Sequence, residues 1–165
     1  MSKQGAAAAS LLAVRLSDQP ITAVYSSTSR RAVETVSPLA EGLDLEIIMV
    51  EQLRERDVPE VPLSEFEEMI KQAWQSPDTG PPGVESNVHA QARGLDVLKK
   101  LVARHPDHHI VIATHGNLMA LIMNGLDRSY NYEFWRQLSF PDVYRLTFEH
   151  GKLSTVERHW EVAAR

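Results

Sequence analysis

The hydrophobic pattern alternates between short apolar runs, which predict strands, and longer stretches with helical spacing. Residues 109–113 form the most informative run, because Ile110, Val111 and Ile112 are consecutive and β-branched, which favours a strand buried on both faces. Polar residues follow at once, and the apolar residues 118–123 then predict a helix. A strand that turns directly into a helix at a polar tip is typical of parallel α/β sheets, which bind ligands at the carboxyl ends of their strands.

The remaining elements follow from the same patterns. Strands are predicted at residues 21–25 and 45–50, and a hairpin with a glycine turn at residues 143–160. Helices are predicted at residues 2–17, 30–43, 63–74 and 85–104, a loop at 76–83, and an aromatic lid or packing segment at 130–135. This order predicts an α/β fold with a layered sheet, mostly parallel with an antiparallel C-terminal hairpin, and helices on both faces.

Composition narrows the classes of protein to consider. A chain of 165 residues with 43% hydrophobic content is expected to fold as a single domain over residues 1–165. The net charge of −5 argues against nucleic acid or an anionic membrane as partner. The absence of cysteine excludes disulfides, thiolate metal sites and a thiol nucleophile. The apolar stretches are too short to cross a bilayer, so a cytoplasmic location is expected.

Two strand-to-helix junctions carry the candidate chemistry. One leads from Ser26-Ser27 into Arg30-Arg31, and the other contains His115. If both strands are parallel, both tips lie on one rim of the sheet. Because a guanidinium fork and helix N-termini both suit a phosphate dianion, we expect an arginine and His115 to lie within one phosphate's reach there. The alternatives are a solvated arginine pair and a histidine that only caps its helix.

The same blocks resemble the histidine phosphatase superfamily, the phosphoglycerate-mutase-like proteins. Residues 25–35 match the pattern SS-x-x-x-RA-x-x-T, and residues 53–55 match L-x-E. Thr114-His115-Gly116 matches the second-histidine block, and Glu85-Ser86 followed by Arg93 is similar to a GES…R block. The resemblance implies that Arg31 binds phosphate, Glu55 protonates the leaving group and His115 orients the phosphoryl group. The implied sites are catalytic His115, Glu55 and Arg31, and phosphate-binding Arg31, His115, Gly116 and Ser27, with no metal and no cofactor.

One part of the family pattern has no counterpart in these residues. The family begins with a strand that ends in Arg-His-Gly, whose histidine becomes phosphorylated, and none of the seven histidines here matches it. His89 could approach the site, although an ordinary helix-face position explains it better. The resemblance thus predicts an N-terminally truncated fold with a gap beside the strand at 109–113. Either the sheet closes up, or another segment or a second copy, as in a homodimer, fills the gap, or the protein starts further upstream.

Three functions remain open from the sequence. The first is a phosphomonoester phosphatase acting on a phosphorylated small molecule through the family's phosphohistidine mechanism, with this chain weak or inactive because it lacks the nucleophile. The second is a non-catalytic phosphate-binding or interaction module on the same fold. The third is a generic α/β binding domain in which His115 is a helix cap. The sequence carries no code for the substrate.

Overall fold

A three-stranded parallel sheet forms the centre of the computed structural model, which describes residues 1–59, 61–80 and 83–160. The strand order is β2-β1-β3, with β1 (Ile21–Ser26) flanked by β2 (Ile47–Met49) and β3 (His109–Ala113). Tyr25 lies opposite Ile48 on one side and Ile112 on the other. Because all three strands are parallel, their carboxyl ends meet at one rim, as the sequence predicts.

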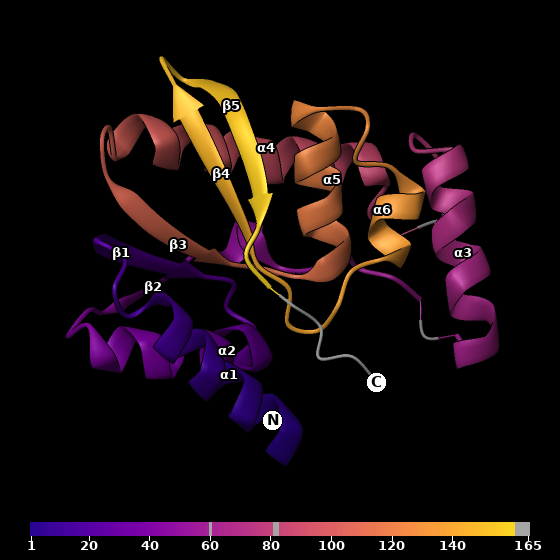
Figure 1. The fold of residues 1–165 in the computed structure, drawn as a ribbon. Helices are drawn as coiled ribbons and strands as arrows, with labels where there is room; N and C mark the ends of the chain where they lie inside the picture. The colour runs from indigo at the N-terminus through magenta and orange to yellow at the C-terminus, as the bar shows by residue number, and fades with distance from the viewer. Residues whose placement is uncertain (60, 81–82, 161–165) are drawn as a thin grey trace.

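Helices cover both faces of this sheet, which confirms the predicted layered α/β architecture (Figure 1). On one face, Val36 and Ala40 of α2 pack against Val24 of β1, and α1 packs on α2. On the other face, α4 packs its apolar side chains against β1. The helices are α1 (Lys3–Leu16), α2 (Arg30–Gly42), α3 (Leu63–Gln75), α4 (Asn87–Arg104), α5 (Gly116–Leu126) and α6 (Tyr132–Arg136).

Helices α4 and α5 approach each other closely. A Cβ atom added to Gly94 of α4 would lie 2.6 Å from Cγ1 of Ile122 in α5, so a larger residue there would force the Ile122 side chain to shift. Buried residues of both helices, among them Ala90 and Leu118, form one apolar cluster with partly buried Trp74 of α3. The close contact brings the segment of α4 that carries Arg93 next to α5.

The predicted C-terminal hairpin is present as a separate two-stranded sheet. Strands β4 (Tyr144–Glu149) and β5 (Lys152–Arg158) pair antiparallel. The turn places His150 and Gly151 at positive φ, 52° and 74°, a conformation that glycine adopts without strain. In Figure 1 the hairpin rises past β3 on the side of the sheet occupied by α4 and α5. Within the described residues it does not pair with the three-stranded sheet.

The expectation that residues 109–113 are buried on both faces is wrong. All five residues of β3 are only half-buried, whereas the last four residues of β1 are buried. The reason is position, because β1 is the central strand, whereas β3 pairs with β1 alone among the described residues. The hairpin has therefore not closed the sheet on the outer side of β3, where the sequence predicts a gap.

The connection after β2 departs from regular strand and helix. The strand predicted at 45–50 is shorter than expected, and a single 3-10 turn, η1 (Glu51–Leu53), follows it. Residues 54–59, which include Glu55, then form neither helix nor strand. No helix in the described part of the chain is long and apolar enough to cross a membrane.

Candidate functional site

The tips of β1 and β3 are joined at the rim. The Ser27 amide donates to the Ala113 carbonyl at 2.9 Å, which continues the parallel pairing beyond the strands. Ser27 follows β1 directly, and His115 is two residues beyond β3. Arg31 lies in the first turn of α2, which begins at Arg30. These two junctions therefore present a hydroxyl, an imidazole and a guanidinium at one place.

Arg31 and His115 are in direct contact, as the sequence predicts. The Nε and Nη2 atoms of Arg31 lie 3.2 and 3.1 Å from Nδ1 of His115. On the other side of the imidazole, Nε2 lies 2.7 Å from Oγ of Ser27, which is fully buried. Arg30 instead points to solvent, with 87% of its side chain exposed, and pairs with Glu34. Of the arginine pair, Arg31 alone faces the site.

These contacts fix the tautomer of His115. Arg31 donates from Nε to Nδ1, so Nδ1 carries no proton. A neutral imidazole has one N–H, which therefore lies on Nε2 and donates to Ser27. This Nε2–H is the group that a phosphoryl oxygen could accept from in place of the serine hydroxyl.

Glu55 caps helix α5 from outside the helix. Its Oε2 and Oε1 atoms accept from the amides of Asn117 and Leu118 at 3.0 and 2.9 Å. His115 occupies the N-cap position, but its side chain makes no capping bond. The interpretation of His115 as a helix cap is therefore wrong, because its side chain accepts no hydrogen bond from the amides of α5. The sequence also predicts two helix N-termini that are open to phosphate. At α5, however, the Glu55 carboxylate already accepts from the amides of Asn117 and Leu118, so the Gly116 amide is the one that stays open to a ligand.

Burial raises the pKa of the Glu55 carboxyl. The backbone amides of Arg56, Asn117 and Leu118, and the nearby charge of Arg31, oppose this shift because they favour the carboxylate, but burial outweighs them. A carboxyl that keeps its proton to higher pH is suited to donating it.

A model of the histidine phosphatase superfamily, branch 1, matches residues 1–161. The chain belongs to the histidine phosphatase superfamily. Among curated protein sequences, none matches the chain significantly.

Solved structures agree with this family. YhfR of Bacillus stearothermophilus is 25% identical, with a TM-score of 0.81 over 99% of this chain and 85% of its own. A mycobacterial glucosyl-3-phosphoglycerate phosphatase in complex with inorganic phosphate is 25% identical, with a TM-score of 0.68 over 84% of this chain and 74% of its own. The same enzyme in complex with VO3 is 27% identical, with a TM-score of 0.67 over the same shares.

The other six histidines of this family member lie outside the site. His105 bonds the Tyr25 hydroxyl, and His108 bonds Thr22 at the opposite end of the sheet. His89 bonds Ser86, the N-cap of α4. In the described part of the chain, none of the six hydrogen-bonds to Arg31, Glu55 or Ser27, and no three His, Asp or Glu side chains are grouped to hold a metal ion. The remaining three are His109, His150 and His159.

Two polar residues at this site were not predicted as members of it. The side chain of Asn117 is buried in the first turn of α5, and neither its oxygen nor its nitrogen has a partner among the described residues. Thr114, next to His115, donates to the Leu53 carbonyl at 2.8 Å and so ties the tip of β3 to the Glu55 segment. Both lie within or beside the Thr-His-Gly block, but only their tertiary neighbours reveal what they contact.

Burial, together with the positive charges of Arg31 and Arg93, lowers the pKa of His115 to about 4. The unfolded chain binds this proton near pH 6.5, whereas the folded protein resists it until about pH 4. We therefore expect the contribution of His115 to the free energy of unfolding to be fully present above pH 6.5. This contribution falls by about 3 kcal/mol as the pH drops toward 4.

Urea unfolding between pH 7.5 and 4 measures this loss. The His115→Gln variant is expected to lose less stability than the wild type over that range, because all other titrating groups stay the same. His108→Gln, at the exposed far end of the sheet, serves as the matched control and keeps the wild-type pH profile. Parallel stability curves for the wild type and His115→Gln would contradict the buried, neutral state of His115.

Proposed function

We propose that the rim formed by Ser27, Arg31 and His115 binds the phosphoryl group of a phosphomonoester, with Gly116 contributing its amide. The contact between Arg31 and His115 carries the proposal, because it holds a fixed cation against a neutral imidazole whose single N–H, on Nε2, faces Ser27 at the same rim. An anion at the rim can accept from the guanidinium N–H groups that do not face Nδ1, and from Nε2–H where it takes the place of the Ser27 hydroxyl. The mycobacterial relative in complex with inorganic phosphate and with VO3 supports this class of ligand.

The three central side chains, Arg31, His115 and Glu55, divide two proposed roles between them. Arg31 and His115 stabilise the charge on the equatorial oxygens of the transferring group. Glu55 protonates the departing alkoxide, which its raised pKa supports. Asn117 supplies a buried amide whose two polar atoms have no partner among the described residues, which favours a bound polar group nearby. We do not assign a nucleophile, because the family mechanism uses the histidine of an Arg-His-Gly motif and none of the seven histidines here matches that motif.

The second candidate is a non-catalytic phosphate-binding module. One observation favours it: the side-chain hydrogen bonds of His89, His105 and His108 all lead away from Arg31 and Glu55. His115 itself is poorly suited to act as the nucleophile, because its Nδ1 accepts from Arg31 and its remaining N–H is needed to stabilise charge. We therefore propose that the 165 residues bind phosphate and hydrolyse phosphomonoesters only weakly.

Hydrolysis of p-nitrophenyl phosphate by the 165-residue protein tests this proposal. We expect turnover close to the uncatalysed rate, with only the small residual activity that electrostatic stabilisation provides. The His115→Ala variant is expected to bind phosphate more weakly, and circular dichroism shows whether both proteins are folded. Robust turnover by the 165-residue protein would falsify the inactive assignment, and its disappearance in His115→Ala would show that this turnover depends on His115.

A further inference from the structure

Glu55 lies in a segment without regular secondary structure, yet its carboxylate is held in a defined place. Three amides converge on it, from Arg56, Asn117 and Leu118. Since two of these amides belong to α5, any movement of the segment relative to α5 would break the bonds. The backbone that carries Glu55 must therefore be fixed by something other than a helix or strand.

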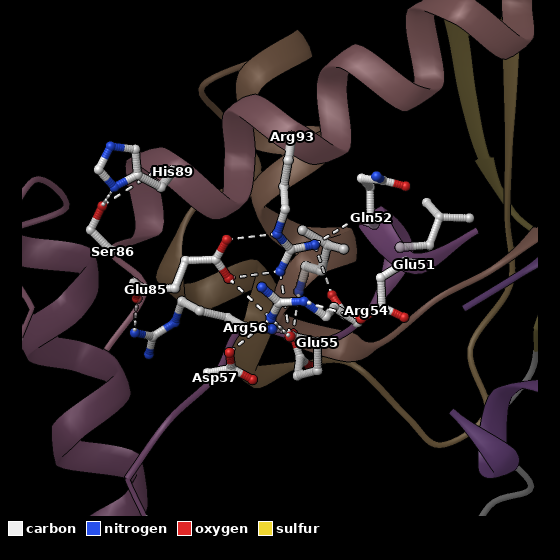
Figure 2. Close-up of polar contacts among 12 residues, drawn as sticks. Glu51, Gln52, Arg54, Glu55, Arg56, Asp57, Glu85, Ser86, His89 and Arg93 are labelled. Atoms are coloured by element: carbon white, nitrogen blue, oxygen red, sulfur yellow. Dashed lines mark hydrogen bonds and ion pairs between the residues drawn. The ribbon is translucent and has the colours of Figure 1, made fainter. Parts of the chain in front are cut away.

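A single arginine of α4 fixes that backbone. The Nη1 atom of Arg93 lies 2.6 Å from the Gln52 carbonyl oxygen and 2.9 Å from that of Arg54. Its Nη2 atom lies 3.4 Å from the carbonyl oxygen of Glu55 itself. Figure 2 shows the Arg93 side chain descending from α4 onto this segment, with dashed lines to its carbonyl groups. Arg93 thus holds three carbonyls of the four-residue stretch that ends at Glu55.

The guanidinium of Arg93 is itself locked by Glu85. Nε and Nη2 of Arg93 lie 2.6 and 2.8 Å from the two carboxylate oxygens of Glu85, a bidentate pair. Both side chains are largely buried, with 15% and 14% of their surface exposed. Arg56 adds a bond from Nη1 to the Glu85 carbonyl at 3.0 Å, which ties the residue after Glu55 to the same place.

The number of N–H donors that Arg93 already uses shows whether it can also bind a substrate anion. A guanidinium has five N–H groups, and Arg93 uses five contacts: two to the Glu85 carboxylate and three to backbone carbonyls. No donor is left for a substrate anion, so Arg93 is not a phosphate ligand like Arg31. A lysine at position 93 could not reproduce the arrangement, because it has three donors and no planar fork.

We propose that Arg93, locked by Glu85, is a positioning residue that sets the place of the Glu55 carboxyl against the start of α5. The proposal rests on the role of Glu55 proposed above, because positioning matters to the reaction only if this carboxyl takes part in it. Thr114 complements the clamp from the other side through its bond to the Leu53 carbonyl. The segment is thereby joined both to α4 and to the residue next to His115.

Nuclear magnetic resonance of the 165-residue protein tests the clamp directly. The measurements are the pH titration of the Glu55 carboxyl carbon and hydrogen exchange at the Asn117 and Leu118 amides, with Glu55→Gln used for assignment. In Arg93→Gln the carboxyl becomes hydrated, so its pKa is expected to move toward the ordinary value. The two amides lose their acceptor and are expected to exchange about tenfold faster or more, whereas core amides such as that of Val24 change much less.

Two further variants separate positioning from general stability. Leu39→Ala removes a buried side chain of α2 and is expected to lower stability without changing the Glu55 titration. Glu85→Gln keeps the cation but loses the lock, and is expected to shift both readouts in the same direction by less. Were Arg93→Gln not to fold, this variant would decide the question alone.

An unchanged Glu55 titration and unchanged exchange at both amides, in a folded Arg93→Gln or Glu85→Gln protein, would overturn the proposal. Neither readout uses phosphate or turnover. If the proposed phosphate site is wrong, the phosphate-binding assays show it. If the role proposed for Arg93 is wrong, the Glu55 titration and the amide exchange show it.

Discussion

Adding a strand that ends in Arg-His-Gly ahead of residue 1 is expected to raise the hydrolysis of p-nitrophenyl phosphate by roughly a thousandfold or more. Mutations that remove a catalytic nucleophile cost several orders of magnitude in rate, so supplying one recovers a similar factor. The added strand has an open edge to pair with, because β3 pairs with β1 alone in the described part of the chain. Steady-state turnover before and after the extension measures the gain.

The same extension is expected to raise stability. Each backbone hydrogen bond added along β3 contributes about 1 kcal/mol, and the half-buried residues Ile110 and Ile112 become covered. An extension that ends in Arg-Gln-Gly is the matched control, because it supplies the strand without the nucleophile. It should raise the thermal midpoint as much as Arg-His-Gly does and leave turnover unchanged. Extensions that alter neither stability nor turnover would show that the outer side of β3 does not accept a strand.

Replacing Arg31 with alanine is expected to weaken phosphate binding by about 100-fold. Two charge-assisted hydrogen bonds from a guanidinium to an anion are worth about 3 kcal/mol together, which corresponds to that factor. The arginine also contacts His115 Nδ1, so its loss frees the imidazole that it orients. Isothermal titration calorimetry with inorganic phosphate at fixed ionic strength gives the two affinities.

The neighbouring arginine provides a matched control for this substitution. Arg30 precedes Arg31 on the same helix and carries the same charge, but 87% of its side chain is exposed and it pairs with Glu34. Arg30→Ala is expected to change phosphate affinity by less than about twofold, because water and salt largely screen a charge on an exposed side chain. Equal losses in the two variants would mean that net charge, and not the geometry of the site, governs binding.

The rim of the sheet could be predicted from the sequence because its signals are local. An apolar β-branched run followed by polar residues identifies the ends of β1 and β3, and parallel pairing then brings Arg31 to His115. Which arginine faces inward followed from the family resemblance. The helical positions of Arg30 and Arg31 alone leave both candidates open, and only packing separates them.

Other features of the site depend on contacts between distant segments. Glu55 lies in a charged run without periodicity, and nothing local indicates that its carboxylate caps α5 more than sixty positions later. Arg93 likewise reaches carbonyls about forty positions earlier; the family resemblance singles it out together with Glu85, but nothing in the sequence indicates that it binds these carbonyls. The half-burial of β3 was missed for a similar reason, because the exposure of a strand is set by its neighbours and not by its own apolar residues.

A crystal structure of the 165-residue protein grown with orthovanadate, a tetrahedral mimic of phosphate, tests the central claim most directly. We predict the anion within hydrogen-bond distance of the Arg31 guanidinium and Nε2 of His115, with the Ser27 hydroxyl and the Gly116 amide beside it. A structure in which vanadate binds elsewhere, or is absent at saturating concentration while Arg31 still contacts His115, would contradict the assignment of this rim as a phosphoryl site.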